Sequence, residues 1–83
     1  MSADKTEYKK IQGQILQLLF DNAKATSFAD ISKLTQKPKS ETEYHCDTLT
    51  KQGLIQSVSI PIGDRFLDGY AITVLGRKTI MEQ

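Results

Sequence analysis

Hydrophobic residues recur at helical spacing near the start of the chain. Between about Lys5 and Lys24 the apolar positions fall three or four residues apart, which places them on one face of an α-helix. This stripe comprises Tyr8, Ile11, Ile15, Leu18 and Leu19, and Phe20 widens it. The spacing predicts a long amphipathic helix that packs its stripe against the rest of the molecule.

A second, shorter helix is predicted from about Phe28 to Leu34, after a brief connection at residues 25–27. Ser27 is suited to cap its first turn, with Asp30 at the third helical position. Pro38 disfavours helical geometry in the residue before it, so we expect the helix to end before Pro38. One face of this helix carries Phe28, Ile31 and Leu34.

A third helix is predicted from about Lys39 or Ser40 to Gln52, with Gly53 as a left-handed cap at its end. Ser40 and Glu43 have the spacing of a capping box. The inward stripe comprises Thr42, Cys46 and Leu49, with His45 half-buried on its flank. The outward face presents Ser40, Glu43, Tyr44, Asp47 and Lys51.

From Gln56 onward the hydrophobic period changes to two, which is the period of a β-strand. Two alternating segments are predicted to form a β-hairpin, with residues 63–69 as the connecting loop and Asp68-Gly69 as a turn signal. Pro61 favours an edge position for the first strand. The alternating apolar residues are Val58, Ile60 and Ile62 in the first strand, and Tyr70, Ile72 and Val74 in the second.

Two further features complete the predicted fold. The loop is expected to fold back and bury Phe66 and Leu67, and the alternative is an exposed apolar tip that serves dimerisation or binds a partner. After the hairpin, a short helix over residues 75–82 is expected to bury Leu75 and Ile80. The fold class is therefore α+β, with a three-helix core, a two-stranded hairpin and a short closing helix in a single domain over residues 1–83.

Composition is that of an ordinary globular protein, with 39% hydrophobic and 25% charged residues among 83. A domain this small buries only about 60% of its unfolded surface, so it is marginal alone and a homodimer or a protein partner is expected. The sequence has no apolar run near the roughly 20 residues that span a bilayer and no signal peptide. We therefore expect a cytoplasmic protein without a membrane partner.

The chain lacks the residue patterns of an enzyme or a metalloprotein. One Cys and one His cannot build a four-ligand zinc site, and neighbouring positions such as His45 and Cys46 point about 100° apart on a helix. A packed thiol is the better interpretation of Cys46. No glycine-rich phosphate loop or catalytic triad pattern occurs either. We expect no catalytic activity, no cofactor and no metal.

The order of elements resembles the winged helix-turn-helix domain of small prokaryotic transcriptional regulators. Three helices, a Gly-Leu-Ile segment and a hairpin are followed by an aromatic-x-aliphatic-Thr-x-x-Gly-basic run. That run consists of Tyr70, Ile72, Thr73, Gly76, Arg77 and Lys78. The resemblance extends from about Tyr8 to Met81 and implies a protein that binds duplex DNA with its third helix and the hairpin, called the wing.

The resemblance also implies a division of roles among residues. Residues that contact phosphates would be Lys37, Lys39 and Lys51, and the wing-tip residue would be Arg65. Residues that face the bases would be Ser40, Glu43, Tyr44 and Asp47. Outward groups in the first turns of a recognition helix are those placed near base edges, while lysines reach phosphates.

Charge leaves a second interpretation open. The net charge is only +1, and between Gln36 and Gln52 three lysines are balanced by Glu41, Glu43 and Asp47. A carboxylate can accept a hydrogen bond from cytosine, yet three of them repel phosphates. The alternative hypothesis is a winged-helix module that binds proteins, with Tyr44 as an exposed anchor.

Overall fold

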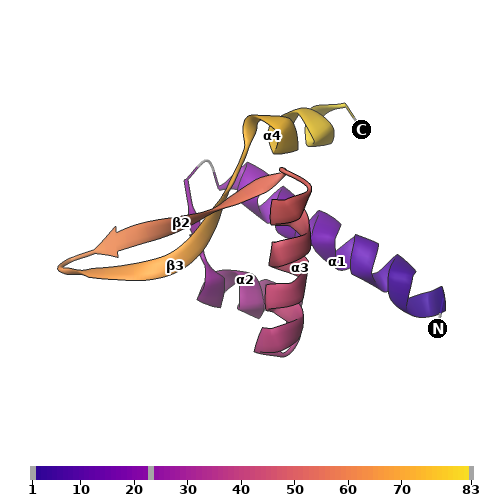
Figure 1. The fold of residues 1–83 in the computed structure, drawn as a ribbon, viewed down its shortest axis with the longest axis horizontal. Coiled ribbons are helices and arrows are strands. Elements are labelled where there is room, and N and C mark those ends of the chain that lie inside the picture. The colour runs from indigo at the N-terminus through magenta and orange to yellow at the C-terminus, as the bar shows by residue number, and fades with distance from the viewer. Residues whose placement is uncertain (1, 23, 83) are drawn as a thin grey trace.

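Over residues 2–22 and 24–82, which a computed structural model describes, the chain forms four helices and a three-stranded antiparallel sheet (Figure 1). The helices are α1 (Ser2–Asp21), α2 (Phe28–Thr35), α3 (Lys39–Lys51) and α4 (Val74–Met81). The strands are β1 (Thr26–Ser27), β2 (Ile55–Ile62) and β3 (Arg65–Ile72). The α+β winged-helix class predicted from the sequence is confirmed.

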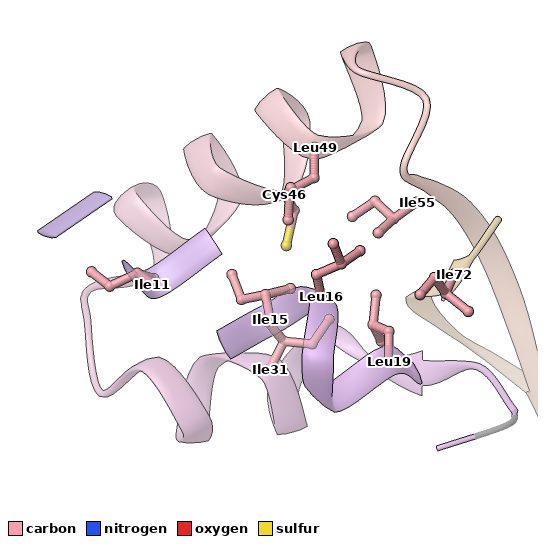
Figure 2. Close-up of a cluster of buried hydrophobic side chains, with 9 residues drawn as sticks. All are labelled: Ile11, Ile15, Leu16, Leu19, Ile31, Cys46, Leu49, Ile55 and Ile72. Carbon is pink, nitrogen blue, oxygen red and sulfur yellow. The ribbon is translucent and has the colours of Figure 1, made fainter. Parts of the chain in front are cut away.

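Helix α1 supplies the largest share of the core. It starts and ends about three residues earlier than predicted, and its last turn closes where the Asn22 amide donates to the Leu18 carbonyl at 3.0 Å. Figure 2 shows side chains of α1 meeting Cys46 and Leu49 from α3 and Ile31 from α2. The buried apolar core comprises Ile11, Ile15, Leu16, Leu19, Ile31, Cys46, Leu49, Ile55 and Ile72.

Among the residues predicted to pack inward from the helices, Leu34 and Leu75 are exposed instead. Leu34 is 40% exposed because it lies at the rim of a shallow groove between α1 and α2, beside Leu18. Leu75 is 51% exposed because Gly76 and Ile80, not Leu75, form the inward side of α4. Leu18 and Leu54 are only partly buried, although both pack against the core.

The turn between α2 and α3 is set by local backbone geometry. Ser27 caps α2 as predicted, since its hydroxyl accepts from the Asp30 amide at 3.3 Å. Gln36 ends α2 in a left-handed conformation with φ 55°. Helix α3 begins at Lys39 with Pro38 as its N-cap, so the predicted capping box at Ser40 is wrong: Ser40 lies inside the first turn.

The sheet has the order β1-β3-β2, with β2 at an open edge as Pro61 indicated. Strands β2 and β3 pair from Ile55↔Ile72 at the base to Ile62↔Arg65 at the tip, and the hairpin projects away from the helices (Figure 1). The turn contains only residues 63 and 64, and a positive φ of 62° at Gly63 suits the first position of a type II′ turn.

The predicted loop over residues 63–69 is therefore wrong, since most of it belongs to β3. Gly69 is not a turn residue but lies in mid-strand, paired with Ser27 of β1 and with Val58 of β2. A Cβ on Gly69 would come within 2.6 Å of the Thr26 carbonyl oxygen. The glycine is required because β1 approaches β3 this closely.

Thr73 joins the base of the hairpin to both neighbouring helices. Its hydroxyl donates to the Gly53 carbonyl at 2.6 Å and accepts from the Gly76 amide at 3.0 Å, which caps α4. Its own amide donates to the Leu54 carbonyl at 3.1 Å. A Cβ on Gly76 would collide with that same carbonyl. The spacing of Thr73 and Gly76 thus serves the packing of the fold.

Candidate nucleic-acid interface

Helix α3 has one fully buried side and one exposed side, as its periodicity predicts. Thr42, His45, Cys46 and Leu49 are buried against the other helices. The exposed row comprises Ser40, Glu43, Tyr44, Asp47 and Lys51. Lys39 begins the helix beside this row and is also exposed. Of the residues assigned to base and phosphate contacts, those on α3 therefore share one accessible surface.

The side of α3 next to the hairpin borders a concave surface, here called the hollow. It has a volume of about 400 Å³. Its lining residues come from the start of α2, from α3 and from both hairpin strands: Phe28, Lys39, Glu43, Ser57, Asp68, Gly69 and Tyr70. The hollow therefore brings two carboxylates, one ammonium group and a phenol together between the third helix and the wing.

The Tyr70 phenol remains protonated in this position. Burial, and secondarily nearby acidic groups that include Asp47, Glu43 and Asp68, raises the pKa of Tyr70. A neutral phenol can donate its hydrogen to an acceptor such as a phosphate oxygen. The sequence did not indicate Tyr70 or Asp68 as site residues, since both fall in a segment assigned to strand packing or to the loop.

Tyr44 lies on the opposite flank of α3, against α1. Its ring centroid is 5.8 Å from that of Tyr8 and 5.5 Å from that of His45. Its side chain is nevertheless 53% exposed. Tyr44 therefore combines a packing role with an accessible edge, and it is displaced from Lys39 and the hollow.

His45 is completely buried, so the prediction of a half-buried imidazole is wrong. Its Nδ1 lies 3.0 Å from Nε2 of Gln12, and its Nε2 lies 3.5 Å from Oε2 of Glu41. The Gln12 amide donates to Nδ1, which leaves the hydrogen on Nε2, and that buried nitrogen has no hydrogen-bond partner within the described residues. The Glu41 carboxylate therefore lies beside the buried His45 ring, with 28% of the Glu41 side chain exposed.

Lys37 is also partly engaged within the protein. Its ammonium nitrogen lies 3.8 Å from Oε2 of Glu7 on α1, and the Lys37 side chain is 32% exposed. An ion pair this loose and this exposed is weak. Lys37 is therefore reachable, but part of its charge is already balanced by Glu7.

The hairpin has two different faces. Residues opposite each other in an antiparallel pair share a face, and successive residues alternate. The face toward α3 carries the pairs Ile55↔Ile72, Ser57↔Tyr70, Ser59↔Asp68 and Pro61↔Phe66. Arg65 is exposed at the tip, but it pairs with Ile62 on the other face. The prediction that Phe66 and Leu67 are buried is wrong, because they are 71% and 40% exposed.

The surface formed by residues 37–72 carries no basic excess. Its bases are Lys37, Lys39, Lys51 and Arg65, and its acids are Glu41, Glu43, Asp47, Asp64 and Asp68. Four bases less five acids give a formal charge of −1 for this part of the chain. Individual lysines at the two ends of α3, Lys39 and Lys51, and not a general positive field, must therefore supply attraction to phosphates.

Residues 2–22 and 24–82 contain no group of three or more His, Cys, Asp or Glu side chains that could hold a metal ion. Cys46 has no solvent exposure, and burial, followed by the charges of Asp47 and Glu43, raises its pKa to about 12. A thiol with that pKa is neither a nucleophile nor a metal ligand at neutral pH. Within the described part of the chain, no helix has the length and apolar character to cross a bilayer.

The fold and the exposed face of α3 define a winged helix-turn-helix domain of the DNA-binding regulator class. The chain belongs to the IclR helix-turn-helix domain family, whose model matches residues 13–59. This range includes the last nine residues of α1, all of β1, α2 and α3, and the first five residues of β2. The chain is therefore a DNA-binding domain of a transcriptional regulator, and the comparison gives no support to the protein-binding alternative.

Two solved structures have the same fold. NadR in complex with 4-hydroxyphenylacetate aligns with a TM-score of 0.71 and 21% identity, over 98% of this chain and 62% of that chain. Apo (heme-free) PefR aligns with a TM-score of 0.68 and 23% identity, over 98% of this chain and 72% of that chain. The chain thus spans about three fifths of the length of NadR. Comparison with curated protein sequences finds no match.

Proposed function

We propose that this domain binds duplex DNA in a sequence-specific manner, with α3 in the major groove and the hairpin against the adjacent backbone and minor groove. The observation that carries the proposal is the exposed row Ser40, Glu43, Asp47 and Lys51, which stands beside a hairpin face turned toward it. A protruding helix flanked by a β-hairpin matches the dimensions of one major groove and its neighbour.

The residues divide into those that set affinity and those that set sequence preference. Lys39 and Lys51 lie at the two ends of α3 and would neutralise phosphates on either side of the groove, with Lys37 as a weaker contributor because of Glu7. Ser40, Glu43 and Asp47 would face base edges, where a carboxylate accepts from cytosine. Tyr44 would contact the edge of the site that is nearest α1, and Arg65 would contact the backbone at the wing tip.

We further propose that the protein acts as a homodimer without catalytic activity in the cytoplasm, where DNA is accessible. The charge of −1 over residues 37–72 supports dimerisation, because one such surface would hold DNA weakly. Two copies related by a two-fold axis would bind two half-sites and combine their affinities. The expected signature is a two-fold symmetric footprint.

A salt-dependent titration tests this proposal. Duplexes selected from a random-sequence library would be titrated with the wild type and with Lys39→Ala, and Lys78→Ala, which removes an exposed charge from α4, serves as the matched control. Lys39→Ala should weaken binding to all sequences and flatten the slope of log affinity against log salt by about one. Asp47→Ala should instead change the ranking of the selected sequences.

The proposal that α3 binds DNA fails if two results are obtained together. If the wild type selects no duplex even at low salt, and Lys39→Glu has no effect on any residual binding, α3 is not a DNA-binding surface. Equal effects of Lys39→Ala and Lys78→Ala would also place the contact elsewhere.

A further inference from the structure

The tip of the hairpin exposes an aromatic side chain that the DNA contacts proposed above leave unused. Phe66 is 71% exposed and pairs across the hairpin with Pro61. A ring this exposed contributes little to packing within the protein, and it offers a large rigid apolar surface to a partner. Its position, and not its exposure alone, identifies that partner.

Phe66 stands on the hairpin face that is turned toward α3. Asp68 and Tyr70, which follow Phe66 in β3 by two and four residues, both line the hollow. Because side chains alternate along a strand, Phe66 shares their face. The hollow is lined on the α3 side by Lys39 and Glu43, and Phe66 lies beyond it on the same hairpin face, at the tip. A duplex that contacts α3 in its major groove is therefore bordered by Phe66 in the next groove.

The hairpin face toward α3 carries no basic side chain. The one base of the hairpin, Arg65, follows Asp64 directly and lies on the face away from α3, while Asp68 lies on the face toward α3. Binding to phosphates scales with the number of cations that neutralise them. On the face toward α3, the hydroxyls of Ser57, Ser59 and Tyr70 lie nearer the base of the hairpin, while the tip carries the apolar Phe66. A contact between the tip of this face and DNA is therefore apolar.

We propose that Phe66 is a minor-groove wedge, whose ring enters the minor groove beside the α3 site and packs against sugars and the edge of one base step. The inference rests on the proposed function. An apolar wedge widens the groove and partly unstacks a step, which costs least at flexible pyrimidine–purine steps such as TA and CA. The partner is thus duplex DNA with such a step beneath the hairpin tip. The protein selects this step through its flexibility, without a base-specific hydrogen bond.

The other hairpin face provides a matched control. Ile62 is 53% exposed at the same tip, and it pairs with Arg65 on the side away from α3. Ile62→Ala therefore removes a comparable exposed apolar side chain from the same hairpin without touching the wedge. Phe66→Leu keeps an apolar side chain in place, whereas Phe66→Ser removes it.

The experiment uses the full chain and a duplex that the wild type has selected from a random-sequence library. Affinity would be measured over a range of salt concentrations for the wild type, Phe66→Leu, Phe66→Ser and Ile62→Ala. A second duplex would replace the pyrimidine–purine step beneath the tip with a stiff A-tract step. Energy transfer between dyes on the duplex ends would report bending.

The wedge predicts a separate result for each variant and each duplex. Phe66→Ser weakens binding to the selected duplex roughly 5- to 150-fold, the range for loss of one aromatic contact to a base, and it reduces the bend. The salt slope stays unchanged, because no cation is removed. Phe66→Leu retains most of the affinity, and Ile62→Ala resembles the wild type. On the stiff duplex the difference between the wild type and Phe66→Ser shrinks.

Three outcomes overturn it. If Phe66→Ser binds with wild-type affinity, Phe66 is not a wedge, while the proposed contacts of α3 still stand. Conversion of a dimer to a monomer by Phe66→Ser, with loss of binding to every sequence, would make the tip a contact between two copies of the chain. If the wild type selects no duplex at all, the proposed function fails first and the wedge fails with it.

Discussion

The hydroxyl oxygens of Thr35 and Thr42 lie 3.0 Å apart in a buried contact between α2 and α3. Thr35 donates its one hydroxyl hydrogen to the Ser32 carbonyl at 3.1 Å, so Thr42 has to be the donor in the threonine pair. This pair is the polar link between the two helices of the helix-turn-helix unit, in a region otherwise held by apolar packing.

Replacing Thr42 by Val should lower the free energy of unfolding by about 1 kcal/mol. Val has nearly the same shape, and Thr35 keeps its bond to Ser32, so the cost is that of one hydrogen bond. Thr48→Val is the control, since the Thr48 hydroxyl bonds only within α3, to the Tyr44 carbonyl. Urea denaturation measures both variants. An equal decrease in unfolding free energy in both variants would mean that the hydrogen bond between α2 and α3 contributes no more than one within a helix.

Cys46 should resist thiol reagents in the folded protein and react only after unfolding. Burial raises its pKa from 9.0 to about 12, so the folded state holds the proton where the unfolded state releases it. The contribution of Cys46 to stability is therefore fully present below pH 9 and is lost as the pH rises from 9 toward 12.

The difference in unfolding free energy between the wild type and Cys46→Ala should consequently shrink over that range of pH. Thermal denaturation of the two proteins at a series of pH values provides the measurement. Rapid labelling of Cys46 in the native protein, at a rate independent of denaturant, would contradict both its burial and its raised pKa.

Gly69→Ala should destabilise the fold by roughly 1–3 kcal/mol, as overpacked positions do. The added Cβ would lie 2.5 Å from Cδ1 of Ile60 and 2.6 Å from the carbonyl oxygen of Thr26. The Ile60 side chain can rotate, but the Thr26 backbone cannot move without separating β1 from β3. Gly13→Ala is the control, because a Cβ there meets nothing within 4 Å.

In contrast to Gly69→Ala, Gly13→Ala should stabilise α1 by about 1 kcal/mol through helix propensity. Calorimetric melting temperatures compare the two alanine variants directly. A neutral result for Gly69→Ala would mean that β1 does not pair with β3 as closely as described.

Asp68→Asn should tighten DNA binding, by up to roughly fivefold at low salt. Asp68 lines the hollow together with Glu43, and a duplex bound across the hollow brings phosphates toward both carboxylates. Asp21→Asn at the end of α1 removes the same charge at a distance from the hollow and should change little. Fluorescence anisotropy at two salt concentrations tests this. Weaker binding in Asp68→Asn would show that Asp68 accepts a hydrogen bond from a base.

The helices and strands of this fold were predictable from local signals. The close contacts between segments that are distant in the sequence were not. Pro38, Gly53 and the change of period near Gln56 fix the limits of α3 and the start of the hairpin. Gly69 was misinterpreted as a turn residue, because the contact that requires a glycine there is made with β1, more than forty residues away. The burial of His45 depends in the same way on Gln12, 33 residues earlier. Periodicity within one element carries no information about such partners.

For the candidate site, helical periodicity correctly predicted which side of α3 is exposed. It could not predict what borders that side. The ring of Tyr44 is held by Tyr8 from α1, and Lys37 is held by Glu7. Only the observed register of β2 and β3 shows that Phe66 and Arg65 lie on opposite faces of the hairpin. One local signal was available but was not used: Glu41 and His45 are four apart on a helix, a spacing at which side chains meet.

The bonds of Thr73 have a consequence for which DNA sites the protein tolerates. One side chain ties the end of α3, the base of the hairpin and the start of α4, through Gly53 and Gly76. Helix α3 and the hairpin are then held as one rigid unit, and the distance between them cannot change independently. A site lengthened by one base pair between the helix contact and the wing contact should be rejected outright, so the protein measures distance along the duplex as well as sequence.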